Sequence, residues 1–157
     1  MTNGGDEVVR YGTTGPEAAS FGHVRICALP VATVIERLRH SIEAAGLLVL
    51  HEIDPQAILG RAGLKIDAAR QLLFFHPRLM ARLLRADPAA LLEVPLKFAV
   101  MALADGTVSV RWLDPTGAFG RYGNAALAEL GRELAGIFEA IAADALGAST
   151  MGDATKG

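Results

Sequence analysis

The sequence lacks several features that would assign it to a specialised class of protein. It has a single cysteine, Cys27, so no disulfide can form within the chain. Its net charge of −2 lacks the cationic excess on which non-specific nucleic-acid binding depends. Its apolar runs fall short of the roughly 18–20 residues of a membrane span, and Asp6 and Glu7 lie where a secretory signal would be apolar. We therefore expect a soluble, cytoplasmic protein that binds neither nucleic acid nor membranes.

The sequence also lacks the motifs of common metal, cofactor and nucleophile sites. Its four histidines show no metal-ligand spacing, and neither a phosphate-binding glycine-lysine loop nor a nucleophile elbow is present. Arginine outnumbers lysine 12 to 3, but the arginines are spread along the chain and indicate no anion-binding patch. We expect no cofactor and no metal, and we assign no catalytic residue.

The 157 residues, 52% of them hydrophobic, are enough for one domain with its own core. Residues 1–21 are rich in glycine and show little periodicity, which is typical of a flexible arm. The small and polar residues 148–157 indicate a disordered tail. A single globular domain is therefore expected over residues 22–147.

Hydrophobic periodicity predicts strands and helices in alternation. Strands are expected at 23–29, 47–53, 70–75, 96–103 and 107–113, and helices at 31–45, at 55–62, from 77 with a second turn after Pro88, and in a long segment that ends the domain. Asp105-Gly106 is typical of a two-residue hairpin turn, and 114–123 of a glycine-rich loop. The hairpin requires an antiparallel pair, so the order favours an α+β fold with its main helices on one face of the sheet. A small, mainly parallel sheet is the alternative.

The first and last helices are expected to pack side by side on that face through continuous apolar stripes. The stripes are Val31, Val34, Ile35, Leu38, Ile42 and Ala45 in the first helix, and Leu127, Leu130, Leu134, Ile137, Ile141 and Ala145 in the last.

Three stretches of the chain resemble the domain-of-unknown-function family 302, a small bacterial and archaeal domain. They are VATVIERLRHSIEAAGLLVLHEID, FFHPRLMARLLRADPAALLEVPLKFAV and DGTVSVRWLDP. The resemblance extends from about His23 to Leu146. It implies a curved, mainly antiparallel sheet with helices packed on one face, similar to the arrangement of the TATA-box-binding protein, and it implies no particular activity.

The chain departs from the resembled family at two places. Members often carry a cysteine-asparagine pair before the proline that corresponds to Pro77, where this chain has Phe75 and His76. They often carry a cysteine after the proline that corresponds to Pro95, where this chain has Leu96. A role that depends on thiols is therefore not expected here.

The candidate ligand-binding residues are His76, Arg78, Lys97, Asp114, Arg121 and Tyr122. The first four lie at predicted strand ends, where the free N–H groups of a following helix favour an anion or a polar ligand. Histidine adds a group that changes charge near neutral pH. The alternative is that His76 caps its helix and that the glycine-rich loop, with Arg121 and Tyr122, only connects two elements.

Two functions follow from this pattern. The one we expect is a dimeric interaction module that holds a small ligand or a partner on its sheet or at the strand-end cleft. Both alternating sets of side chains in 70–75 and 96–103 are apolar, so a sheet with helices on one face leaves a second face for a homodimer or a partner protein. The alternative is a small enzyme that uses His76 as an acid or base beside an arginine or a carboxylate.

Overall fold

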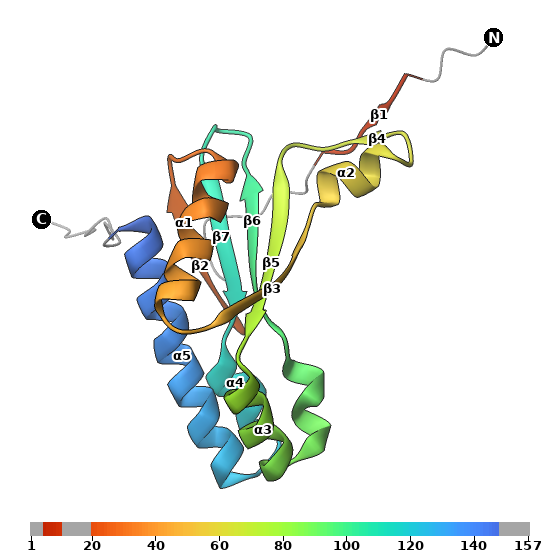
Figure 1. Cartoon of the computed structure of the whole chain (residues 1–157). Coiled ribbons are helices and arrows are strands. Elements are labelled where there is room, and N and C mark those ends of the chain that lie inside the picture. The colour runs from red at the N-terminus through yellow and green to blue at the C-terminus, as the bar shows by residue number, and fades with distance from the viewer. Residues whose placement is uncertain (1–4, 11–19, 148–157) are drawn as a thin grey trace, which may run out of the picture.

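A computed structural model describes residues 5–10 and 20–147 of the chain (Figure 1). The strands are β1 (Glu7–Val8), β2 (Gly22–Cys27), β3 (Leu48–Ile53), β4 (Leu64–Lys65), β5 (Ala69–Phe75), β6 (Leu96–Ala102) and β7 (Val108–Leu113). The helices are α1 (Val31–Ala44), α2 (Pro55–Gly60), α3 (Pro77–Ala86), the 3-10 helix η1 (Pro88–Glu93), α4 (Pro115–Gly120) and α5 (Ala125–Leu146). The predicted tail at 148–157 lies outside the described residues, as do residues 1–4 and 11–19 of the predicted arm.

The main sheet has five strands in the order β2-β7-β6-β5-β3, and every neighbouring pair is antiparallel. The predicted α+β class with a mainly antiparallel sheet is therefore confirmed, and the mainly parallel alternative is wrong. A second pair, β1 and β4, is parallel and joins part of the expected N-terminal arm to the segment after α2.

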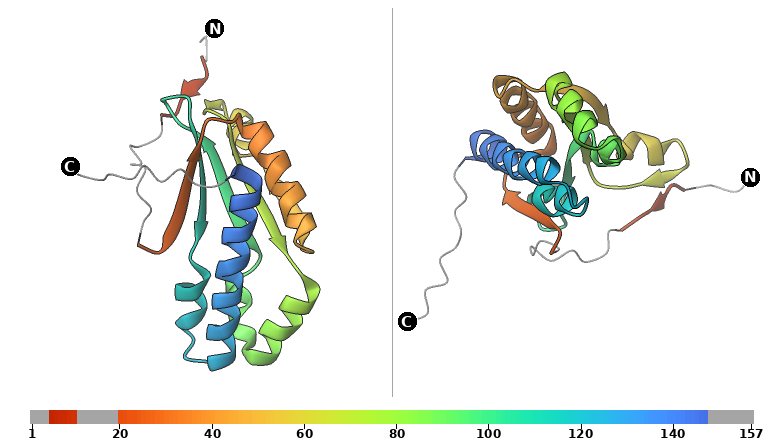
Figure 2. Two further views of the ribbon diagram at one scale, coloured as in Figure 1. Left: turned by 90° about the vertical axis from the view of Figure 1, so that its left-hand side faces the viewer. Right: turned by 90° about the horizontal axis from the view of Figure 1, so that it is seen from below.

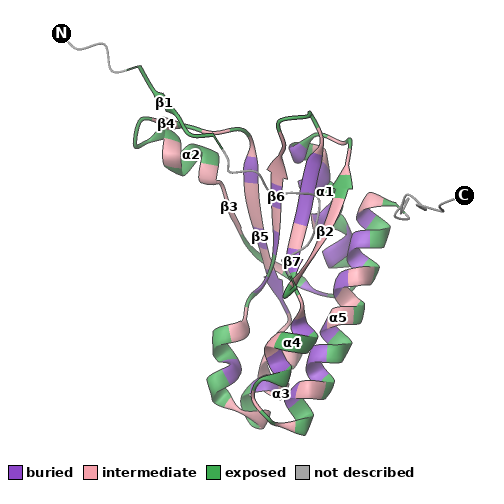
Figure 3. Ribbon diagram, turned by 180° about the vertical axis from the view of Figure 1, so that it is seen from behind, coloured by how far each residue is buried: buried purple, intermediate pink, exposed green. Residues whose placement is uncertain are grey.

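Helices α1 and α5 lie side by side on one face of this sheet (Figures 1 and 2). The buried side chains Leu38 and Ile42 of α1 and Leu134 of α5 confirm the expected packing of the two apolar stripes. Ala45, expected in the first stripe, follows the helix as its C-cap and is exposed. We call the opposite face, which no described helix covers, the helix-free face (Figure 3).

The core under the helices is built around an aromatic cluster. The Phe98 ring lies 5.3 Å from that of Phe74 and 5.1 Å from that of Phe138, and Trp112 stacks on Phe138 at 6.0 Å. Strand residues two apart share a face, so β5, β6 and β7 deliver these rings to the helix side. Phe138 is the buried side chain that anchors α5 to the sheet. The predicted stripe contained the neighbouring Ile137 instead, which is half-buried.

Below the sheet, α3, η1, α4 and the first half of α5 form a helical half of the molecule (Figure 1). The expected loop at 114–123 is wrong over most of its length, because α4 occupies Pro115–Gly120. Its N-cap Asp114 accepts a hydrogen bond from the Thr116 N–H at 3.1 Å, and Pro115 fits the first helical position. A Cβ on Gly131 would lie 2.8 Å from the Pro115 carbonyl oxygen, so only a glycine in α5 permits this close approach of α4.

The hairpin between β6 and β7 has a longer turn than expected. The Leu103 N–H donates to the Thr107 carbonyl at 2.8 Å, which leaves three residues in the loop instead of two. Gly106 has a φ of 84°, a conformation that glycine adopts without strain. Asp105 accepts hydrogen bonds from the side-chain hydroxyl and the backbone N–H of Thr107, which lower the pKa of its carboxyl.

Candidate functional site

His76 and Asp114 lie at the same end of the sheet, but strand β6 separates their two strands. His76 is the N-cap of α3, and its Nδ1 accepts a hydrogen bond from the Arg78 N–H at 3.0 Å. The lone pair of Nδ1 is thus already used, and no contact among the described residues joins this imidazole to a carboxylate. These contacts are those of a helix cap, and the Arg78 side chain is exposed beside it.

Lys97 lies near the start of the intervening strand β6, at the same end of the sheet as His76 and Asp114. It is exposed and pairs with Leu73, which places it on the helix-free face. No hydrogen bond or ion pair within 5–10 and 20–147 joins it to another candidate residue. The described contacts thus do not gather the four strand-end candidates into one site.

Arg121 and Tyr122 are brought together by Glu93, at the end of η1. The Glu93 carboxylate accepts from the Arg121 guanidinium at 2.7 Å and from the Tyr122 hydroxyl at 2.9 Å. Burial, and next the hydrogen bond to Glu93, raise the pKa of Tyr122. These two hydrogen bonds tie the end of α4 to η1. The Glu93 side chain is only 15% exposed, and its carboxylate is satisfied by Arg121 and Tyr122.

A second group of charged and aromatic side chains, which we call the β2 cluster, was not predicted. It consists of His23, Arg25, Trp112, Asp114 and Glu139. The His23 ring stacks on Trp112 at 5.4 Å, its Nε2 lies 3.9 Å from an Asp114 oxygen, and its Nδ1 lies 3.9 Å from a Glu139 oxygen. Arg25 donates to Glu139 at 2.7 Å and lies over the Trp112 ring, 5.6 Å from its centre.

The β2 cluster joins the edge strand β2 to helix α5. The side chains of its ion pairs are one third to one half exposed, so a pair such as that of Arg25 and Glu139 contributes about 0.2–1 kcal/mol to stability. The two 3.9 Å separations are too long for hydrogen bonds. Within the described parts of the chain, no three histidine, cysteine or acidic side chains are arranged to hold a metal ion.

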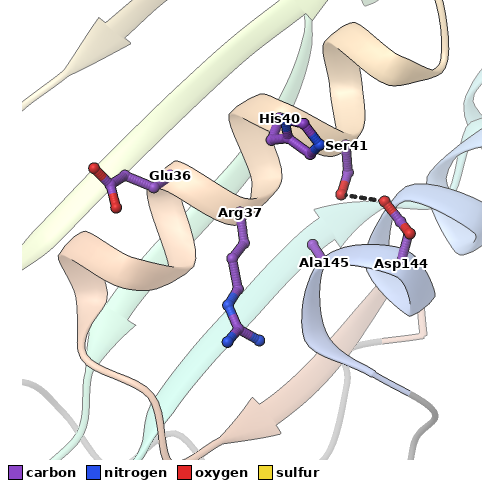
Figure 4. A pocket seen from close by; sticks show the side chains of 6 residues that line it. All are labelled: Glu36, Arg37, His40, Ser41, Asp144 and Ala145. Atoms are coloured by element: carbon purple, nitrogen blue, oxygen red, sulfur yellow. Dashed lines mark hydrogen bonds between the residues drawn. The ribbon is translucent and has the colours of Figure 1, made fainter.

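A polar pocket of about 360 Å³ lies between α1 and the end of α5 (Figure 4). Its lining comprises Glu36, Arg37, His40, Ser41, Asp144 and Ala145. The Ser41 hydroxyl donates to Asp144 at 2.6 Å, and His40 is not bonded to it. The hydrogen bond therefore links two helices through the Asp144 carboxylate.

The outer edge of β2 combines a regular backbone with exposed apolar side chains. Phe21 is 66% exposed, Ile26 42% and Leu113 56%, and Leu113 is the residue in register with Gly22. The pairing of β2 with β7 runs from Gly22 to Cys27 without interruption. At the other edge of the sheet, the register of β3 shifts between Val49 and His51.

Comparison with known proteins gives the family and the fold. Residues 23–141 match the family described as "Domain of unknown function DUF302". The crystal structure of an uncharacterized conserved DUF302 protein from Bacillus stearothermophilus has a TM-score of 0.75 and 23% identity, over 81% of this chain and 99% of the other. This likeness shows a shared fold. No match to the chain is found among curated proteins, and no helix in the described residues is long and apolar enough to cross a membrane.

Proposed function

The chain belongs to the DUF302 family, whose function is unknown, and we propose that its domain is a self-associating interaction module. The observation that carries this proposal is the group of exposed apolar side chains along the β2 edge, Phe21, Ile26 and Leu113. Phe21 and Leu113 lie at one end of β2 and Ile26 lies near the other, so exposed apolar side chains flank the open strand at both ends. Exposed apolar side chains that recur along one edge favour a protein interface. A second copy of the domain is the partner that we propose for it.

The helix-free face carries further apolar side chains, interspersed with polar ones such as Arg111, which lies between Val24 and Ala99. Val24, Leu73, Ala99 and Met101 lie on it and are half-buried, and no described helix packs over them. An antiparallel sheet can leave its second face to solvent, but apolar side chains on that face favour a further protein surface. This supports the interaction module independently of the edge.

The alternative of an enzyme that uses His76 has no comparable support. Its Nδ1 is engaged by the Arg78 N–H, and the pocket between α1 and α5 does not include His76. The histidine that does lie between carboxylates, His23, belongs to the β2 cluster beside the proposed interface.

Analytical ultracentrifugation tests the proposal. The wild-type chain should show a weight-average mass that rises from monomer toward dimer between about 1 and 100 μM, since a single strand edge buries less than the roughly 800 Å² per partner of a standard interface. Ile26→Asp, which places a charge on the apolar edge, should weaken association at least tenfold, about 1.4 kcal/mol.

The matched control is Ile58→Asp in α2. Ile58 is 50% exposed, similar to Ile26, but lies away from β2, so this variant should associate like the wild type. A monomeric wild type at every concentration, or equal losses in the two variants, would contradict the proposal.

A further inference from the structure

We infer that two copies of the domain pair their β2 strands antiparallel about a two-fold axis at Val24, which joins two five-stranded sheets into one. This inference rests on the proposed self-association and adds to it the contact element and its register.

The backbone of β2 has a defined outward set of hydrogen-bonding groups. The Asp114 N–H donates to the Phe21 carbonyl at 2.9 Å, so the polar groups of Phe21 point toward β7. In an antiparallel ladder this direction alternates, so Gly22, Val24 and Ile26 direct their N–H and C=O groups away from β7. No described strand pairs with that side, and the Val24 carbonyl accepts only a long contact of 3.5 Å from the neighbouring Arg25 guanidinium. A regular strand without a partner strand is a template for another strand.

The number of hydrogen-bonded pairs selects the register. With the axis at Val24, that residue faces Val24 of the second copy and Gly22 faces Ile26, so every outward residue of β2 is paired. Moving the axis to His23 or Arg25 leaves one outward residue of each strand without a partner in β2. An axis at Arg25 would also place two guanidinium groups opposite each other, which is unfavourable.

The side chains on the helix-free face complement each other in this register. Gly22 lies between Leu113 on β7 and Ile26 of the second copy. Those two residues are two strand spacings apart, roughly 9–10 Å, and no side chain lies between them because the middle residue is glycine. The exposed Leu113 and Ile26 can therefore cover Gly22 and contact each other, and the symmetry repeats the contact.

On the other face, the same register brings the two β2 clusters together. His23 faces Arg25 of the second copy, and each Arg25 retains its own Glu139 at 2.7 Å. The Glu139 and Asp114 carboxylates thus lie beside the Arg25 guanidinium and the His23 ring of both copies. Phe21, the most exposed aromatic residue near this strand, faces Cys27 of the second copy.

Disulfide trapping tests the register in the full chain. Val24→Cys is introduced with Cys27→Ser, so that one thiol remains. In a hydrogen-bonded antiparallel pair the two Cα atoms are about 5.5 Å apart, within the range that a disulfide spans. Mild oxidation should link the Val24→Cys chain to its symmetry mate at least tenfold faster than it links the matched variants Arg25→Cys or Ile26→Cys, whose side chains face other residues.

A second variant removes the central hydrogen bonds between the two β2 strands, those donated by the Val24 N–H of each copy, and keeps the native Cys27. Val24→Pro deletes an N–H that points away from β7, a change that an edge strand tolerates, so the variant should keep the circular dichroism of the wild type and sediment as a monomer. A folded Val24→Pro chain that still dimerises would overturn the inference.

The possible results distinguish the Val24 register from the β2 contact, and both of these from self-association in general. Fastest crosslinking in the Arg25→Cys or the Ile26→Cys variant would overturn the Val24 register. A dimer in the ultracentrifuge with slow crosslinking in all three variants would overturn the β2 contact and leave self-association standing. A monomeric wild type would overturn both.

Discussion

The helical half of this molecule and its sheet half satisfy their polar groups in different ways. In the helical half, each helix begins with a side chain that accepts a hydrogen bond from the backbone, namely His76, Asp87, Asp114 and Asn124. In the sheet half, Asp54 caps α2, but α1 begins without a side-chain cap, and no described segment pairs with the outer side of β2. The comparison teaches that the helical half is complete within one chain, whereas the sheet half has groups to offer to another.

The largest expected effect tests which face of the sheet carries the core. Phe98→Ala removes a fully buried ring that contacts Phe74 and Phe138, and should lower the free energy of unfolding by about 3–5 kcal/mol in urea denaturation. Met101→Ala alters the other face of the same strand, where the side chain is half-buried, and should cost clearly less. Equal losses would mean that the two faces contribute equally to the core.

A smaller effect tests how the helical half is closed. Asn124 accepts from the N–H groups of Ala126 and Leu127, and its amide donates to the Ala86 carbonyl at 3.0 Å. Asn124→Ala should cost about 1–2 kcal/mol of unfolding free energy, measured by chemical denaturation. Asn124→Asp keeps the cap and loses only the donor to Ala86, so its loss should lie between those of the wild type and the alanine variant. An unchanged Asn124→Ala would show that the cap is dispensable.

The smallest effect concerns the link between η1 and α4. Burial and the Glu93 carboxylate raise the pKa of Tyr122, so Glu93→Gln should return it part of the way toward the ordinary value of about 10. Tyrosinate absorbance measures this in a Tyr11→Phe background, since the chain has two tyrosines.

The same shift predicts the sign of a pH effect on stability. The folded chain holds the Tyr122 proton more tightly than the unfolded chain does, because its pKa is raised on folding. The contribution of Tyr122 is therefore complete below the ordinary tyrosine pKa and is lost as the pH rises through the raised one. Tyr122→Phe should reduce the alkaline loss of stability in thermal melts, and an identical pH profile would contradict the raised pKa of Tyr122.

Most of the fold could be predicted from the sequence because its signals are local. The apolar periods and the hairpin predict the antiparallel sheet and both long helices. Helix α4 was missed because Gly117 and Gly120 are poor helix formers, although Asp114-Pro115 is a helix-start signal. Its packing against Gly131 of α5 is a tertiary contact that outweighs this low propensity.

Less of the candidate site could be predicted, because its contacts join distant parts of the chain. Arg25 and Glu139 are 114 residues apart, and Arg121 meets Glu93 across 28. The alternation of His23 and Arg25 on one face of a strand was visible in the sequence, but the helix that faces them was not. The alternative of His76 as a helix cap needed only local spacing and agrees with its hydrogen bond to Arg78.

The register shift in β3 would limit how far the proposed assembly of this chain can grow. A sheet with two regular edges has no natural end, because each added copy presents a new edge, and the product is a fibre. Here the shift between Val49 and His51 interrupts one edge, while β2 is regular along its whole length. Two copies joined through β2 would expose only interrupted edges at both ends, so growth would stop at the dimer.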